Sequence, residues 1–132
     1  MSERKNAARR RHPEEDEQQA LFQWVDWVSG KHPELEMLFH IPNGGKRNKL
    51  EAIRLKREGV RAGVPDLFLP VARGGYHGLF IELKAGKGVA SLMQREWIAR
   101  LEKQGYRAQI AVGWEEAAKV IMEYLKLEGT KE

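Results

Sequence analysis

The sequence predicts a single α/β domain in which a central mixed β-sheet is flanked by helices, in the order α-β-α-β-β-α-β-α. The chain of 132 residues is long enough to bury one core and too short for two. Segments with apolar residues at helical spacing alternate with short apolar runs bounded by Gly and Pro. Two neighbouring runs predict a hairpin, and the helix that follows them predicts a crossover to a parallel strand.

Apolar spacing and boundary residues place the elements along the chain. Pro13 suits the first turn of a helix, the acidic residues after it complement the helix dipole, and Gly30 can end the helix near Ser29. Leu21 and Val25 lie on its core-facing stripe. The later elements are a strand over 35–41, a helix over 48–58, strands over 66–71 and 79–84, a helix over 92–104, a strand over 107–112 and a helix over 114–127.

Composition bounds the domain organisation and the kind of metal site. We expect a basic N-terminal arm over 1–12, one folded domain over 13–127 and a polar tail over 128–132. No apolar run is long enough to cross a bilayer, and the basic N-terminus lacks the apolar segment of a signal peptide, which favours a cytoplasmic protein. Cysteine is absent, so a metal site would use Asp, Glu or His, and oxygen ligands favour Mg²⁺ or Mn²⁺.

Positive charge is concentrated in two stretches of a chain whose net charge is +4. Two basic stretches around an acidic centre are expected of an enzyme that binds a polyanion, and solvated surface charge is the alternative. The first stretch contains Arg4, Lys5, Arg9, Arg10 and Arg11. The second contains Lys46, Arg47, Lys49, Arg54, Lys56, Arg57 and Arg61.

Three charged residues interrupt the apolar strands of the predicted hairpin. Asp66 begins the first strand, and Glu82 and Lys84 lie in the second. Because side chains alternate between the faces of a strand, Glu82 and Lys84 share one face with Phe80. A charge buried there is costly unless it is paired or holds a metal. The three residues are therefore either a candidate active site or a structural ion pair at the hairpin.

This combination suits the cleavage of a phosphodiester bond. A divalent metal held by carboxylates neutralises the anionic substrate and activates water, and a nearby lysine can orient that water or stabilise developing charge. Asp66 and Glu82 supply oxygen ligands, the Leu83 carbonyl can add a backbone oxygen, and Lys84 is two residues along from Glu82. The spacing meets the requirements of metal-dependent phosphodiester hydrolysis.

The pattern of Pro65-Asp66 followed by Glu82-Leu83-Lys84 resembles the PD-(D/E)XK nuclease superfamily. The surrounding segments resemble the VRR-NUC family within it, over roughly residues 14–125. That family includes small stand-alone phage and bacterial nucleases and the nuclease module of a eukaryotic DNA-repair enzyme. The segments are Ile41-Pro42-Asn43-Gly44-Gly45-Lys46-Arg47, Gly59-Val60, Gly63-Val64-Pro65-Asp66, and Glu82-Leu83-Lys84 followed by Ser91 and Gln94.

The resemblance implies a restriction-endonuclease-like core and a structure-selective DNA endonuclease with Mg²⁺ or Mn²⁺ as cofactor. Asp66 and Glu82 would be metal ligands and Lys84 the catalytic lysine, while Gln94 matches a family glutamine on the helix after the lysine. Small stand-alone members resemble Holliday-junction resolvases in being dimeric. The resemblance therefore implies a homodimer that acts on branched DNA, a link to DNA repair, and a phage or bacterial origin.

The family also has an acid on the first helix in a Glu-x-x-x-Gln setting. Glu14 with Gln18 fits this setting, and both residues lie on the backward extension of the core stripe. We therefore expect Glu14 to be a further catalytic residue and metal ligand. Glu15 with Gln19 has the same spacing and Glu17 also lies on the stripe, so the position of the acid stays open. The alternative is that all these acids only complement the helix dipole.

A Gly-rich turn before the second helix is the predicted phosphate-binding segment. A turn with free backbone N–H groups that opens a helix can cradle a phosphate, although the P-loop spacing is missing and a plain connection is the alternative. His40 lies just before this turn, and a structural role is favoured over substrate contact. The predicted DNA-binding residues are Asn43, Gly44, Gly45, Lys46, Arg47 and Arg61.

Two other functions are compatible with part of the sequence. A non-catalytic nucleic-acid-binding module on a nuclease fold would use the basic stretches and cleave nothing. A protein-interaction domain would make the basic stretches incidental. The combination of Asp66, Glu82 and Lys84 favours the nuclease over both.

Overall fold

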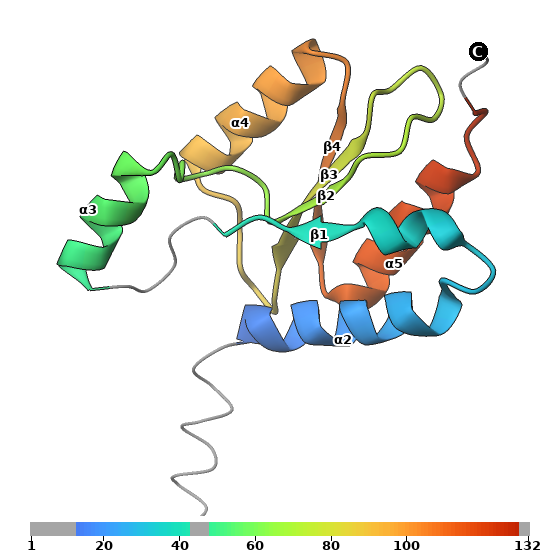
Figure 1. Ribbon diagram of the computed structural model, residues 1–132, viewed down its shortest axis with the longest axis horizontal. Helices are drawn as coiled ribbons and strands as arrows, with labels where there is room; N and C mark the ends of the chain where they lie inside the picture. The colour runs from blue at the N-terminus through green and yellow to red at the C-terminus, as the bar shows by residue number, and fades with distance from the viewer. Residues whose placement is uncertain (1–12, 43–47, 130–132) are drawn as a thin grey trace, which may run out of the picture.

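The computed structural model describes residues 13–42 and 48–129. The order of elements follows the prediction, with one short 3₁₀ helix added (Figure 1). The elements are α2 (Pro13–Val28), η1 (Pro33–Met37), β1 (Phe39–His40), α3 (Lys49–Arg57), β2 (Leu67–Leu69), β3 (Leu79–Lys84), α4 (Leu92–Lys103), β4 (Arg107–Val112) and α5 (Trp114–Leu125).

The four strands form one mixed sheet in the order β1-β2-β3-β4. Strand β2 is antiparallel to both β1 and β3, whereas β3 and β4 run parallel. The predicted hairpin and the predicted crossover through α4 are both confirmed. The α/β class with a mixed sheet flanked by helices is therefore confirmed as well.

The two faces of the sheet are covered by different helices. Helices α2 and α5 pack on the face that carries the aliphatic side chains of β2 and β3, and α4 approaches the other face (Figure 1). Among the described residues, no helix is long and apolar enough to span a membrane. The buried core consists of Leu21, Val25, Leu35, Leu38, Leu67, Leu69, Val71, Leu79, Ile81, Leu83, Ala111, Ala117, Ala118, Ile121 and Tyr124.

The predicted strand over 35–41 is wrong in its first half. This part of the chain forms η1, and β1 contains only Phe39–His40. Pro33 stands at the start of η1, where proline is tolerated. Leu35 and Leu38 are both buried and lie three residues apart, which matches the repeat of a 3₁₀ turn and not the two-residue repeat of a strand.

Helix α3 differs from the helices that cover the sheet. None of its residues is buried, and it stands apart from the sheet (Figure 1). The predicted start of this helix is close to the observed one, because the Asn48 side chain accepts a hydrogen bond from Glu51 N at 2.7 Å and caps the first turn. Its apolar residues are therefore not part of the core.

Candidate active site

The hairpin places Asp66 and Glu82 opposite each other. The observed register pairs Leu67 with Ile81, so the next position outward pairs Asp66 with Glu82. Residues that lie opposite each other in an antiparallel pair project to the same face. Lys84 is two residues beyond Glu82 and shares that face. The structure thus brings together the three charged residues that the sequence singled out.

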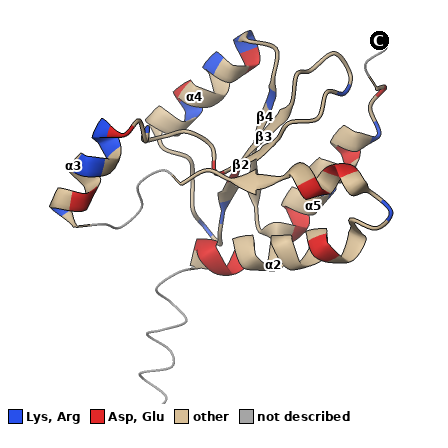
Figure 2. Ribbon diagram, viewed as in Figure 1, with Lys and Arg blue, Asp and Glu red and all other residues tan. Residues whose placement is uncertain are grey.

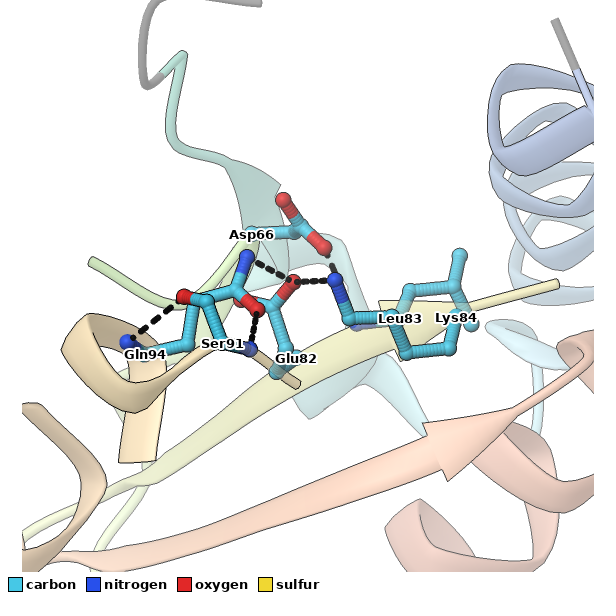
Figure 3. Close-up of polar contacts among 6 residues, drawn as sticks. All are labelled: Asp66, Glu82, Leu83, Lys84, Ser91 and Gln94. Atoms are coloured by element: carbon cyan, nitrogen blue, oxygen red, sulfur yellow. Dashed lines mark hydrogen bonds and ion pairs between the residues drawn. The ribbon is translucent and has the colours of Figure 1, made fainter. Parts of the chain in front are cut away.

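Short polar contacts connect these residues (Figure 3). Asp66 Oδ2 accepts a hydrogen bond from Leu83 N at 2.9 Å, and Lys84 Nζ lies 3.3 Å from Glu82 Oε2. Glu82 is 1% exposed and Lys84 is 7% exposed, whereas Asp66 is half-buried. The pair of Glu82 and Lys84 is a buried ion pair, and Asp66 forms its more open side.

Gln94 connects the buried carboxylate to the first turn of α4. Its Nε2 donates to Glu82 Oε2 at 3.1 Å, and its Oε1 accepts from Ser91 N at 2.8 Å. The Ser91 hydroxyl in turn accepts from Gln94 N at 3.1 Å, which completes a capping box. The amide of Gln94 is therefore held with its NH₂ group toward Glu82 (Figure 3).

The electrostatics of Glu82 are unusual for a carboxyl group. Burial, followed by the nearby Asp66 carboxylate, raises the pKa of Glu82 from 4.5 to about 8, although the Lys84 ammonium acts in the opposite direction. Glu82 Oε1 is buried and forms no hydrogen bond within the described part of the chain. A buried oxygen without a partner is costly, so this position favours a cation or a proton.

The backbone next to Glu82 adds a further oxygen. Gly113 N donates to Lys84 O, so the even-numbered carbonyls of β3 face β4, and the Leu83 carbonyl faces β2. The residue opposite Leu83 in the continued register is Pro65, which has no N–H group to donate. The sheet therefore leaves the Leu83 carbonyl without a ladder hydrogen bond from this position.

These groups fit a hard divalent cation. Two adjacent carboxylates and a backbone carbonyl are the oxygen ligands that Mg²⁺ prefers, and Mg²⁺ keeps several waters of its own. No three Asp, Glu, His or Cys side chains are grouped to hold a metal within residues 13–42 and 48–129. Asp66, Glu82 and the Leu83 carbonyl are thus the groups available, and Glu14 does not join the two carboxylates in such a group.

The acids of α2 separate in space. A Cβ atom built on Gly88 would lie 3.7 Å from both Glu14 Oε2 and Lys84 Cδ, so the glycine leaves the space between the two side chains open. Glu17 instead accepts a hydrogen bond from Trp114 N at 2.8 Å and thereby caps α5. The structure therefore places Glu14 at the lysine end of the site and gives Glu17 a structural contact.

Of the predicted DNA-binding residues, the structure describes Arg61. Asn43, Gly44, Gly45, Lys46 and Arg47 lie outside the described residues, and Arg61 is exposed on the loop between α3 and Asp66. His40 Nδ1 donates to the Asp66 carbonyl at 3.0 Å, which agrees with the structural role favoured from the sequence.

Sequence reasoning missed two parts of this arrangement. The cap that Glu17 places on α5 joins residues 97 positions apart, and no local signal reports such a contact. The orientation of Gln94 by Ser91 was readable, because Ser-x-x-Gln before an apolar helix is a capping-box pattern.

Comparison with known proteins agrees with this geometry. The sequence model of the VRR-NUC domain matches residues 2–114. A solved structure described as a VRR_NUC domain protein is 35% identical, with a TM-score of 0.74 over 90% of this chain and 93% of that chain. No curated protein matches the chain. The chain therefore belongs to the VRR-NUC domain family, and its general function is that of a nuclease.

Proposed function

We propose that this nuclease is a divalent-metal-dependent, structure-selective DNA endonuclease that hydrolyses phosphodiester bonds, with Mg²⁺ or Mn²⁺ as cofactor. The observation that carries the proposal is the buried Glu82 carboxylate. One of its oxygens contacts Lys84 and Gln94, and the other has no hydrogen-bond partner in the described residues. A site built only for stability would satisfy both oxygens.

Asp66, Glu82 and the Leu83 carbonyl would hold the metal. When bound, the metal neutralises the charge of the phosphodiester and lowers the pKa of water. The contact from Gln94 Nε2 fixes the orientation of Glu82, and the contact from Leu83 N fixes that of Asp66. Both carboxylates are therefore positioned before any substrate arrives.

Lys84 acts from the same face of β3 as Glu82. Its ammonium lies 3.3 Å from Glu82 Oε2, so its position is set by the carboxylate and by the strand. A lysine held there orients the attacking water and stabilises the charge that develops on the phosphate. Glu14 Oε2 and Lys84 Cδ both lie beside Gly88, so this acid of α2 is near the lysine end of the site.

We further propose that two copies act together on branched DNA, as in Holliday-junction resolvases. The described part of one chain carries one such site, and resolving a four-way junction requires a cut in each of two strands. Two-fold dimers are the commonest oligomers and would present two sites related by symmetry. Sedimentation at micromolar concentration, with and without a four-way junction, tests this part: a monomer that still cuts both strands in one encounter would contradict it.

The cleavage test uses labelled four-way junction, flap, nicked and intact duplex DNA. Wild type should cleave a branched substrate in Mg²⁺, whereas Asp66→Asn, Lys84→Met or added EDTA should lower the rate at least 100-fold, roughly the cost of removing one electrostatic stabiliser. Glu17→Gln is the control: it changes a carboxylate that contacts Trp114 N of α5, and it should cleave at close to the wild-type rate.

Equal product formation by all variants, with or without EDTA, would refute the proposed activity. Salt-dependent binding without products in Mg²⁺ or Mn²⁺ would instead identify a non-catalytic nucleic-acid-binding module.

A further inference from the structure

Helix α3 exposes apolar side chains that no described part of the chain covers. Leu50 is 81% exposed and Ile53 is 44% exposed. A helix of nine residues is marginal in isolation, and most of the stability of such a helix comes from packing of its apolar face. Exposed apolar side chains at neighbouring positions indicate a contact surface.

These side chains share one face of the helix with cations. Leu50, Ile53 and Arg57 follow one another at spacings of three and four, which places them in one row. Lys49 and Arg54 flank this row, at 100° per residue. Leu55 is half-buried and turns away from it. We call the surface formed by Lys49, Leu50, Ile53, Arg54 and Arg57 the outer face of α3.

The outer face is strongly positive. Helix α3 contains four cations and one carboxylate, whereas α2 begins with three acids, a contrast that Figure 2 shows. Arg54 is paired with Glu58 at 3.4 Å, and both side chains are more than half exposed, so this pair is weak and open to exchange. A polyanion is therefore the partner whose charge complements this face.

The loop that follows α3 is fixed on the same helix that supports the active site. Gly63, with φ +90°, packs so closely that a Cβ atom would lie 2.7 Å from Met93 Cγ. Trp97 Nε1 donates to the Ala62 carbonyl at 3.1 Å. Because α4 also carries Gln94, which contacts Glu82, the loop after α3 and the site share one support.

We propose that the outer face of α3 is a DNA-contacting surface that recognises interruptions of the duplex; the inference rests on the proposed function. Lys49, Arg54 and Arg57 contact phosphates. Leu50 and Ile53 pack on base faces, which are covered inside a continuous stack and accessible where stacking is broken. Apolar side chains of this kind insert at base steps in other DNA-binding proteins, and contacts with bare base faces tolerate any sequence.

A second copy of the chain is a poorer occupant of this face. A two-fold interface places the same patch on both sides, so the cations of one copy would meet those of the other. Like charges brought together in this way are destabilising. The positive charge of the outer face therefore favours DNA over a second copy of the chain as its partner.

The test measures binding in EDTA, so that cleavage does not interfere. A labelled four-way junction is the probe, and relaxed closed-circular duplex DNA, which has no ends, is the competitor. The apolar variant is Leu50→Ser with Ile53→Ser, and the charge variant is Lys49→Gln with Arg54→Gln and Arg57→Gln. Matched controls are Trp27→Ser, an 82% exposed apolar residue on α2, and the double change Lys119→Gln on α5 with Lys126→Gln at the C-cap of α5.

The apolar variant should bind the junction about tenfold more weakly, equivalent to about 1.4 kcal/mol, and should bind the circular duplex within about twofold of wild type. The charge variant should weaken both and lower the slope of log K against log salt by about 2 to 3. The controls should change neither, and thermal unfolding should confirm that every variant is folded.

Unchanged junction affinity in the apolar variant would overturn the inference. So would an equal loss on both DNAs, or a shift of the apolar variant from dimer to monomer in sedimentation, which would identify a second copy as the occupant. Failure of the proposed function is a separate result, because it is absence of cleavage by wild type in Mg²⁺ whatever the binding data show.

Discussion

The two faces of strand β3 perform different tasks within six residues. Leu79, Ile81 and Leu83 project into the core beneath α2 and α5, whereas Glu82 and Lys84 project to the side of α4. All of these residues are buried. Burial alone therefore does not distinguish the faces. The core face needs only shape, because apolar contacts have no direction, whereas each charge on the site face needs a partner at a defined distance.

The largest effect is expected on the core face and concerns stability. Ile81→Ala should lower the free energy of unfolding by about 2–5 kcal/mol, because a buried side chain is replaced by a cavity. Urea unfolding measures the loss. Molecules of this variant that remain folded should cleave at close to the wild-type rate, since Ile81 projects away from Glu82. A tenfold loss of activity in fully folded protein would show that the two faces are not independent.

A change of intermediate size is expected where α4 meets the site face. Gln94→Met removes the donor to Glu82 Oε2 and should lower activity or apparent Mg²⁺ affinity by about 10- to 100-fold, the usual cost of losing such a supporting contact. A Mg²⁺ titration of the cleavage rate measures it.

Ser91→Ala is the matched control for Gln94→Met. It removes the hydroxyl of the capping box and should cost about 1 kcal/mol of stability. The backbone N–H that orients the Gln94 amide is retained, so activity should stay near wild type. If both variants lose activity equally, the helix end and not the amide controls the site.

An effect similar in size to that of Gln94→Met is a dependence of stability on pH in EDTA. The pKa of Glu82 is about 8 in the folded protein, whereas its ordinary value, which unfolding restores, is 4.5. Between these values the folded state holds a proton that the unfolded state releases. Stability should therefore fall as pH rises through this window, by up to about 1.4 kcal/mol per pH unit.

Urea unfolding of wild type and Glu82→Gln at about pH 5.5 and pH 7.5 isolates this contribution. The wild type should lose more stability than the variant over that interval. Mg²⁺ should reduce the difference, because metal binding displaces the proton. Identical pH dependence of the two proteins would mean that Glu82 is ionised throughout.

Local pattern was sufficient for much of the fold. The alternation in 79–84 predicts β3 with its observed bounds, and the helix predicted over 92–104 begins at the first residue of α4. Over 35–41 the pattern failed, because a mostly apolar run of seven residues suits a strand and a 3₁₀ turn alike. The contact of Leu35 and Leu38 with the core decides between the two.

By itself, the sequence determined which side chains share a face: Glu82 with Lys84 on β3, and Leu21 with Val25 on α2. Periodicity is a local property, so it is readable without the fold. Only the tertiary structure decided that Asp66 faces Glu82 and that Glu17 caps α5. Those outcomes depend on hairpin register and on the packing of α2 against α5, which join residues distant along the chain and leave no mark in local spacing.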